Sequence, residues 1–466
     1  MDFPLFHLDF MGNRMLIAII AILHVIINHA LAVGFIPLVT LIEYRGYKLG
    51  KLQIETSANW DELAYKLMKT GFIITTSVGA LTGVGIWFAA SLVNPASIGS
   101  LIRIFYMAWF TEWIIFVLEV VFIMIYFLTW KKSNSSDKSK RQHILFGVFL
   151  SIFSWITMVI IVAILSFMMD PGDWVNKPSF FNGVFNPIYF PQLMFRTPVA
   201  MIMAGTFALF LARIYLKRTN AIFSKAIRFI SFWILFWSPY ALFGAYLYYY
   251  KIPTFMIGNL PVAVATQAFQ QWYGTLIYII IIAISAALLI SLLGIFRPKK
   301  MPKYALILPL VFIFFFMGTF ERIREFIRKP YVINEYMFAN AFLKSDYPLF
   351  QKEGILPHAT YSSIKKITEE NKVQAGKEVF ILTCSRCHTT HGINSVLQNF
   401  ELMYGKENLV VENLNSYIKN MHNARIYMPP FPGNQEETEA LSAYIISLQH
   451  YPNHVEGAQS SGTKMN

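Results

Sequence analysis

The only two cysteines of this 466-residue chain stand together in Cys384-Ser-Arg-Cys387-His388. A Cys-x-x-Cys-His pattern is the attachment site of a c-type haem, in which two thiols bind the vinyl groups and the adjacent imidazole binds the iron. A zinc site would want about four ligands, and the chain has no further cysteine. The motif therefore predicts covalent haem c on Cys384 and Cys387, with His388 as an axial ligand.

The opposite axial position has four candidates, namely Met428, Met421, His422 and His391. Met428 is followed by two prolines, which remove backbone donors and stiffen the loop that carries the ligand. This segment resembles class I cytochromes c, which place a distal methionine before proline. A thioether ligand also raises the reduction potential. We expect Met428 to be the ligand, and His391 stands too close to His388 to reach the other haem face.

Apolar segments long enough to cross a bilayer recur through the first 328 residues. The chain is 56% hydrophobic and 14% charged, unlike an ordinary soluble domain. Met1 to Asn13 lacks the pattern of a cleavable signal, so the first apolar segment is expected to remain as a helix. We predict eight spans, at about 15–43, 67–93, 101–130, 143–168, 190–217, 227–250, 272–297 and 302–328.

The net charge of +13 is concentrated in alternate loops and does not indicate nucleic-acid binding. Lysine and arginine gather at 45–51, 131–141, 217–228 and 297–303, whereas residues 94–100 have neither. The positive-inside rule then places the N-terminus and everything after the eighth span outside. Haem c is attached on that side of a bacterial inner membrane, so both signals predict a multi-pass inner-membrane protein with a periplasmic haem c.

We expect an all-α protein, with a polytopic membrane helix bundle and a C-terminal extracytoplasmic cytochrome c domain. The predicted parts are a transmembrane domain at 1–329, a connector at 330–370, a cytochrome c domain at 371–452 and a disordered tail at 453–466. Proline closes the eighth span near 330. Amphipathic helices are predicted at 374–380 and 436–449.

Several ionisable residues lie at membrane depth, where each is a functional-site hypothesis. Glu112 and Glu119 are seven residues apart and share one helix face, about 10 Å apart along the axis. Glu325 and Arg328 are three apart and can pair across a turn. A lone histidine on an apolar helix is more often an ordinary core residue, which is how we interpret His29.

Five segments together resemble subunit I of the cytochrome bd-type oxidases, over roughly residues 10–335. They are Leu23-His24, Glu43-Tyr44, the run from Thr111 to Glu119, Phe185-Asn186-Pro187 and Glu325-Phe-Ile-Arg328-Lys-Pro-Tyr331. The last is similar to the family's Glu-x-Gly-Arg-Gln-Pro-Trp and is the most specific. The spacing of the two glutamates differs by one residue from the family pattern, which leaves open which of them plays which role.

The resemblance implies a set of site residues and cofactors. His24 would ligate an oxygen-site haem, either haem d or a second haem b, and Glu325 a high-spin haem b. Glu112 and Glu119 would line the haem and its proton path, and Arg328 joins them as a candidate catalytic residue. A second, haem-free membrane subunit and dioxygen are the implied partners.

Departures from the family suggest a variant. The histidine that holds the low-spin haem b is replaced by Arg196, and Tyr240 and Leu242 stand where arginine and methionine are expected. The long loop that binds quinol is missing, because only about residues 251–271 join the sixth and seventh spans, and eight spans replace nine. These losses suggest that haem c replaces quinol as the electron input.

The sequence thus predicts a bd-like oxygen reductase that takes electrons from a cytochrome c-type donor through haem c. One alternative is an electron-transfer anchor without a catalytic site, which would have no need of buried carboxylates. Another is reduction of nitric oxide or another small acceptor at the same site, because a vacant haem position accepts either diatomic.

Overall fold

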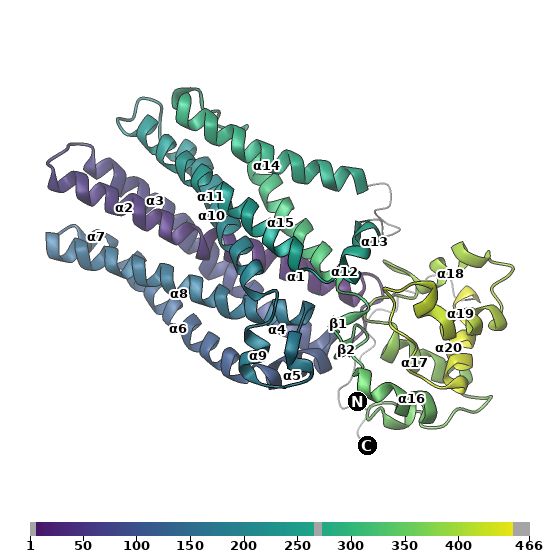
Figure 1. The fold of residues 1–466 in the computed structure, drawn as a ribbon. Coiled ribbons are helices and arrows are strands. Elements are labelled where there is room, and N and C mark those ends of the chain that lie inside the picture. Colours follow the sequence, from purple (N-terminus) through teal and green to yellow (C-terminus); the bar gives the residue numbers. More distant parts are fainter. Residues whose placement is uncertain (1–5, 265–272, 451–466) are drawn as a thin grey trace, which may run out of the picture. The chain divides into compact units, whose positions relative to one another are not determined.

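The computed structural model describes residues 6–264 and 273–450, which are mostly helical (Figure 1). The chain divides into two compact units. The membrane unit comprises Ile20–Trp87 and Ser100–Arg328. The C-terminal unit comprises Met1–Ile19, Phe88–Gly99 and Lys329–Asn466. The finer predicted division into domain, connector and cytochrome domain stays a prediction, and the tail at 453–466 lies outside the described residues.

Among the described residues, six helical segments are long and apolar enough to cross a membrane. They correspond to the first six predicted spans, which are thereby confirmed as apolar helices of sufficient length. Their elements are α1 (Asn13–Ile27), η1 (Asn28–Val33), α2 (Phe35–Lys51), α3 (Ser57–Ile74), η2 (Thr75–Gly79), α4 (Ala80–Val93), α6 (Tyr106–Leu128), α8 (Asp137–Met169), α10 (Tyr189–Tyr215) and α11 (Phe223–Lys251).

The last two predicted spans coincide with α14 (Tyr273–Phe296) and α15 (Ile307–Ile327), and as membrane spans they stay predictions. In α14, the apolar stretch found among the described residues is Ile280–Phe296. In α15, the second half carries Glu321, Arg322 and Arg324. Charged side chains are costly in hydrocarbon, so this half of α15 must find partners on other helices.

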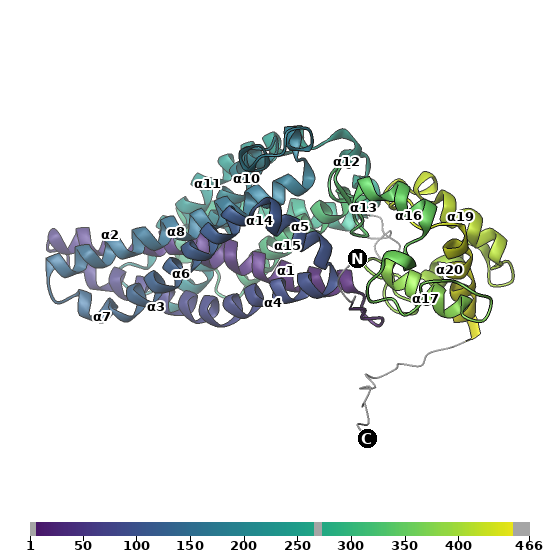
Figure 2. The same ribbon diagram turned by 90° about the horizontal axis from the view of Figure 1, so that it is seen from below.

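Of the six candidate spans, α10 is the most buried. It packs along α11, while α2 packs along α3 and α6 along α8 (Figures 1 and 2). Small residues allow the closest approaches. A Cβ atom on Gly244 of α11 would lie 2.3 Å from the carbonyl oxygen of Met194 on α10. Helices in membranes use such glycines because packing, rather than the hydrophobic effect, holds them together.

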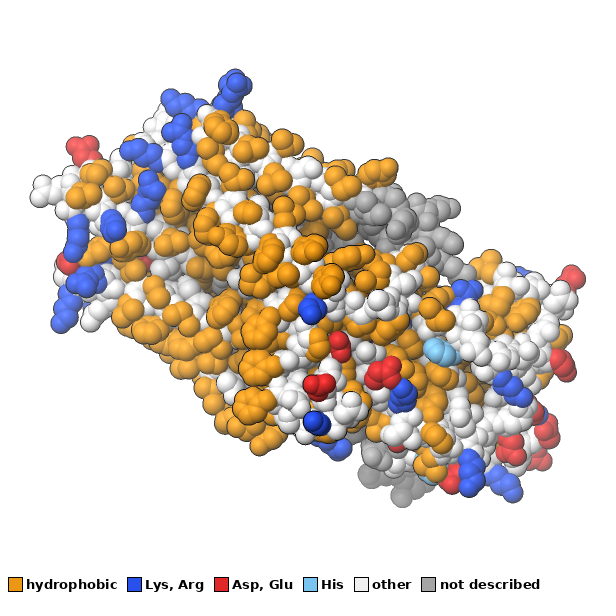
Figure 3. Space-filling view, in the orientation of Figure 1, with side chains coloured by type: hydrophobic (Ala, Val, Ile, Leu, Met, Phe, Trp, Pro, Cys, Tyr) orange, Lys and Arg blue, Asp and Glu red, His pale blue; other side chains and the backbone are white. Residues whose placement is uncertain are grey.

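On the face drawn in Figure 3, many lysine and arginine side chains lie at one end of the membrane unit, beside an apolar band. This end holds the α2–α3 connection, α7 (Trp130–Ser133), the α10–α11 connection and η5 (Pro298–Lys300). We call it the basic end. Other short helices of the chain are α5 (Pro95–Ile104), η3 (Gly172–Val175), α9 (Phe180–Val184), α12 (Thr254–Gly258) and α13 (Leu260–Val264).

In the C-terminal unit, α17 (Lys372–Thr383), α18 (Val396–Tyr404), α19 (Val411–Ala424) and α20 (Gln435–Ser447) surround one apolar core. Helices are therefore present at both predicted amphipathic segments. A Cβ atom on Gly376 of α17 would lie 2.0 Å from the carbonyl oxygen of Ala440 on α20, so the two backbones touch there. The hairpin β1 (Tyr331–Ile333) and β2 (Met337–Phe338) and the helix α16 (Tyr347–Glu353) precede them. The 3-10 turns are η6 (Lys344–Asp346), η7 (Leu356–His358) and η8 (Leu448–His450).

Candidate functional site

The Cys-x-x-Cys-His motif forms a tight turn directly after α17. The backbone N–H groups of Cys387 and His388 donate to the carbonyl oxygen of Cys384 at 3.0 and 2.9 Å. Neither cysteine is in a disulfide, and burial raises the pKa of the Cys384 thiol to about 11. His388 Nδ1 lies 3.2 Å from the carbonyl oxygen of Asn394, which can only accept a hydrogen bond. The Nε2 lone pair is then available to bind iron, so the turn fits a haem c.

Met428 lies in the loop between α19 and α20, and two side chains of α19 hold that loop. His422 Nδ1 lies 2.5 Å from the carbonyl oxygen of Met428, and the Tyr417 hydroxyl lies 3.9 Å from its sulfur. His422 therefore donates to the Met428 segment. Met421 packs against the apolar core of the unit. These contacts support Met428 as the axial ligand, which stays a prediction.

The N-terminal strap, which we define as residues 6–12, packs against the loop that follows His388 (residues 389–395). Asp9 accepts hydrogen bonds from the Thr390 N–H and hydroxyl, both at 2.6 Å, and from the His391 N–H at 3.3 Å. Burial raises the Asp9 pKa, but hydrogen bonds from His7, Thr390 and His391 outweigh it and hold the pKa well below its usual range. A Cβ atom on Gly392 would lie 2.1 Å from the Asp9 carbonyl oxygen, so only glycine fits there.

A buried charge cluster occupies the interior of the membrane unit. Arg196 of α10 is fully buried, and its Nη2 lies 2.5 Å from Glu321 Oε1 of α15. The other carboxylate oxygen of Glu321 accepts from Arg324 Nε at 3.0 Å. Arg196 Nη1 lies 3.2 Å from His29 Nε2 of η1, and because arginine can only donate, the His29 Nε2 lone pair is taken by this bond. His29 is therefore a partner of Arg196 and is not free to bind iron.

The remaining membrane candidates are also fixed by neighbours. Arg328 Nη2 donates to Glu325 across one turn, as their spacing predicts. The Thr82 hydroxyl donates its single proton to the Val78 carbonyl at 2.7 Å and accepts from His24 Nδ1 at 3.3 Å. This arrangement leaves His24 Nε2 available for a haem iron. Next to Thr82, a Cβ atom on Gly83 would lie 3.1 Å from the His24 ring, so the glycine leaves that ring room.

Glu112 and Glu119 lie on α6, one above the other at the seven-residue spacing. Ser154 of α8 donates to Glu119 Oε1 at 2.7 Å, and the Thr157 hydroxyl lies 3.4 Å from Oε2. Hydroxyl groups of a neighbouring helix therefore face both oxygens of the Glu119 carboxylate. Such a pair of carboxyl groups, set in apolar surroundings, suits the holding and transfer of protons.

Residues 13–248 match the sequence profile described as cytochrome bd terminal oxidase subunit I. These residues are half of the chain. The chain belongs to this family. The structure titled "The structure of bd oxidase from Geobacillus thermodenitrificans" is similar, with a TM-score of 0.54 and 15% identity, over 70% of this chain and 90% of that chain. At this identity the likeness shows a shared fold. No curated protein matches the chain.

Membership of the bd oxidase family makes the chain a multi-pass, haem-binding membrane subunit of an oxidoreductase. Oxidases of this family have a second subunit and react with dioxygen. The matched residues include His24, Glu112, Glu119 and Arg196. Glu325 and the haem c motif lie beyond residue 248, so the match does not bear on them and their roles stay predictions.

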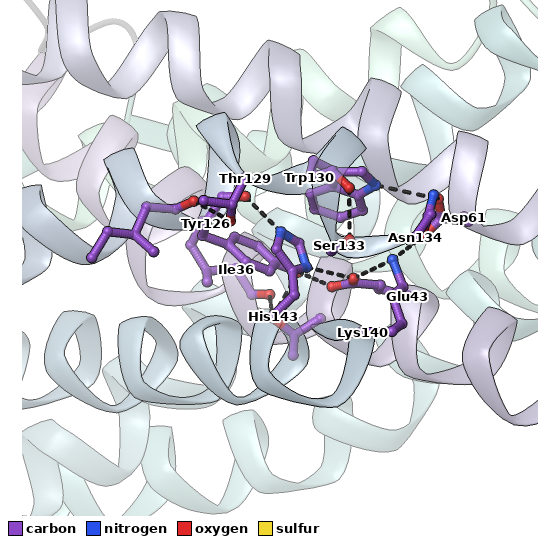
Figure 4. Close-up of polar contacts among 12 residues, drawn as sticks. Ile36, Glu43, Asp61, Tyr126, Thr129, Trp130, Ser133, Asn134, Lys140 and His143 are labelled. Carbon is purple, nitrogen blue, oxygen red and sulfur yellow. Dashed lines mark hydrogen bonds and ion pairs between the residues drawn. The ribbon is translucent and has the colours of Figure 1, made fainter. Parts of the chain in front are cut away.

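Sequence reasoning missed a second buried cluster, at the basic end of this bd oxidase subunit (Figure 4). Glu43, which the family resemblance includes, contacts both Lys140 and His143 at 2.6 Å. Lys140 counts in the sequence as one more basic loop residue, and His143 as a residue near the start of an apolar span. No local pattern reveals the cluster, because Glu43 and His143 are 100 residues apart.

Proposed function

We propose that this chain is the haem subunit of a bd-like oxygen reductase that takes electrons through covalent haem c from a cytochrome c-type donor. The observation that carries the proposal is the turn at Cys384–His388. Both of its thiols are free, and the contact of His388 Nδ1 with Asn394 leaves Nε2 for iron. A haem c in the same chain as a bd-type core supplies an electron input that does not need quinol.

The surroundings of Arg196 support the loss of the low-spin haem b. A guanidinium has no lone pair to offer to iron, and Arg196 is engaged by Glu321 and His29. Leu242, which stands where the resemblance expects the methionine ligand, likewise has no donor atom for iron. On this proposal, the ion pair of Arg196 and Glu321 takes the place of the ligand that the family resemblance assigns to the low-spin haem b.

The residues present fit the groups that the family and the motif imply. His388 and Met428 would hold haem c, Glu325 a high-spin haem b, and His24 an oxygen-site haem d or second haem b. When bound, these haems supply electron transfer and the reduction of dioxygen to water. Arg328 holds the Glu325 carboxylate in one orientation, while Glu119 and Glu112 hold and pass the protons that the reaction consumes.

The distribution of charge supports an orientation in a bacterial inner membrane. By the positive-inside rule, the basic end faces the cytoplasm. The haem c domain and its donor would then be on the outer side, where haem c is attached. A second, haem-free membrane subunit completes the complex.

The test is a visible spectrum of the purified, dithionite-reduced complex with and without carbon monoxide. We expect a six-coordinate haem c that CO leaves unchanged and a high-spin haem that CO shifts. Reduced cytochrome c, and not quinol, should then support oxygen uptake by the complex. A spectrum unaffected by CO would overturn the assignment as an oxidase and favour an electron-transfer anchor without a catalytic site. Oxygen uptake driven by quinol would refute haem c as the electron input. Turnover with nitric oxide but not with oxygen would show that nitric oxide is the acceptor.

A further inference from the structure

Five side chains from four helices form a buried polar cluster at the basic end of the membrane unit (Figure 4). Glu43 comes from α2, Asp61 from α3, Tyr126 from α6, and Lys140 and His143 from α8. Glu43 and Tyr126 are fully buried, and His143 is 2% exposed. Burying several ionisable groups is costly unless every one of them is paired. We call them the Glu43 cluster.

The geometry of His143 fixes one proton in this cluster. His143 Nε2 lies 2.7 Å from the carbonyl oxygen of Tyr126, which can only accept, so Nε2 carries a hydrogen. His143 Nδ1 lies 2.6 Å from Glu43 Oε1. A contact this short between a ring nitrogen and a carboxyl oxygen needs a proton between them, on either atom. Glu43 and His143 therefore share one proton.

Charge counting shows what happens when that proton leaves. Lys140 Nζ lies 2.6 Å from Glu43 Oε1 and 2.5 Å from Asp61 Oδ1, so one ammonium serves two carboxylates. With the shared proton in place, Lys140, Asp61, Glu43 and His143 sum to zero. Without it, one negative charge stays buried, which is unfavourable. The shared proton can leave only if another replaces it, as in a relay.

The cluster reaches water on one side. Burial falls from Glu43 outward, since the Lys140 side chain is 9% exposed and that of Asp61 18%. Asp61 Oδ2 also accepts from Asn134 at 3.0 Å and lies 3.4 Å from Trp130 Nε1, both next to the basic α6–α8 connection. A proton from the water phase can therefore reach the shared position through Asp61 and then Lys140, whose ammonium contacts both carboxylates.

On the other side, the cluster continues toward the glutamates of α6. The Tyr126 hydroxyl donates to Glu43 Oε2 at 2.7 Å. Tyr126 follows Glu119 by seven residues, so both lie on one face of α6, about 10 Å apart. On α8, His143 and Ser154 are eleven residues apart, which is about three turns, and Ser154 donates to Glu119. The faces that α6 and α8 turn toward each other therefore carry polar residues at the level of Glu43 and again at the level of Glu119.

We propose that the Glu43–His143 pair holds a transferable proton and is the proton-uptake site of this subunit at the basic end. A proton leaves the pair toward Glu119, past Tyr126. Lys140 then passes a proton to the pair and regains one from water through Asp61. No electron moves in this step, and the cluster returns to its starting charge. The inference rests on the proposed function, because Glu119 must need protons for the relay to run.

The test uses Glu43→Gln and Tyr126→Phe in the purified complex. Glu43→Gln removes the shared proton, and Tyr126→Phe removes the hydroxyl while retaining the ring and all ion pairs. The control is Glu62→Gln, which neutralises an exposed carboxylate on α3 that pairs with Lys66 at 2.6 Å. Proton uptake is measured with a pH dye after the fully reduced complex is mixed with oxygen, and haem content and CO binding are measured beside it.

We expect both variants to keep wild-type haem content and CO binding, with proton uptake slowed about tenfold or more. Glu43→Asp should take up protons faster than Glu43→Gln but more slowly than wild type. The control Glu62→Gln should take up protons at the wild-type rate. Uptake at the wild-type rate in Tyr126→Phe, or in a folded Glu43→Gln, would overturn the proton-uptake site. A wild-type complex that neither binds CO nor consumes oxygen would instead refute the proposed function.

Discussion

Arg196 and Glu321 form an ion pair in the interior of the membrane unit, with Nη2 of one 2.5 Å from Oε1 of the other. Arg196 is fully buried, and Glu321 is 8% exposed. The pair joins α10 to α15, and His29 adds a contact from η1. Three elements of the membrane unit therefore meet at one buried carboxylate that contacts two arginines.

Removing one partner of this pair should therefore destabilise the protein. Arg196→Leu leaves the Glu321 carboxylate buried beside Arg324 alone, and losing one partner of a buried pair costs about 3–5 kcal/mol. We expect a lower midpoint in thermal unfolding of the detergent-solubilised complex. A single variant as stable as wild type would contradict the assignment, and the exposed Glu62→Gln is the matched control.

The two kinds of haem c attachment, thioether bonds and axial ligation, should be lost in different variants. Cys384→Ala and Cys387→Ala should remove one or both thioether bonds, which is checked by haem staining of the denatured chain. Met428→Ala should keep covalent haem but lower its midpoint potential, because a thioether ligand raises it. An unchanged potential in Met428→Ala would point to another axial ligand, with Met421→Ala as the comparison.

Glu325→Ala should reduce the haem b content of the purified complex by one high-spin haem, measured by pyridine haemochrome analysis. The reason is that, in the proposed assignment, Glu325 would supply the carboxylate ligand and its bond to Arg328 would orient it. Arg328→Lys keeps the charge but cannot form the same directed bond, and should weaken haem b retention less than Glu325→Ala. Full haem b content in Glu325→Ala would refute its role as ligand.

The strap should respond to acid according to the lowered Asp9 pKa. A carboxyl group with a depressed native pKa stabilises the fold above its unfolded pKa of about 3.9, and this stabilisation is lost as the pH falls through the native value. At neutral pH, Asp9→Asn should weaken the hydrogen bonds to the loop by about 1 kcal/mol, given that Asp9 is partly exposed.

Amide exchange of Thr390 and His391 measures that effect, because their N–H groups donate to Asp9. We expect exchange at both amides to be faster in Asp9→Asn than in wild type at neutral pH. In wild type, the same loss of protection is expected only in strong acid. Glu369→Gln, at an exposed ion pair with Lys372, should leave them unchanged. Equal protection of Thr390 in wild type and Asp9→Asn would show that the strap does not hold this loop.

What the sequence determined follows from short-range patterns. Helical spans follow from the length of apolar runs, the haem c motif from five adjacent residues, and the Glu325–Arg328 pair from a three-residue spacing across one turn. Each of these needs information from a single segment, so each could be found before the fold was known.

Tertiary structure alone decided which distant charges meet. Arg196 and His29 are 167 residues apart, and Glu43 and His143 are 100 apart, so no spacing rule links them. In an apolar bundle the cost of an unpaired charge forces such groups together, but helix packing decides which ones. For that reason His29 and His143 look like ordinary core residues in the sequence and belong to charge clusters in the structure.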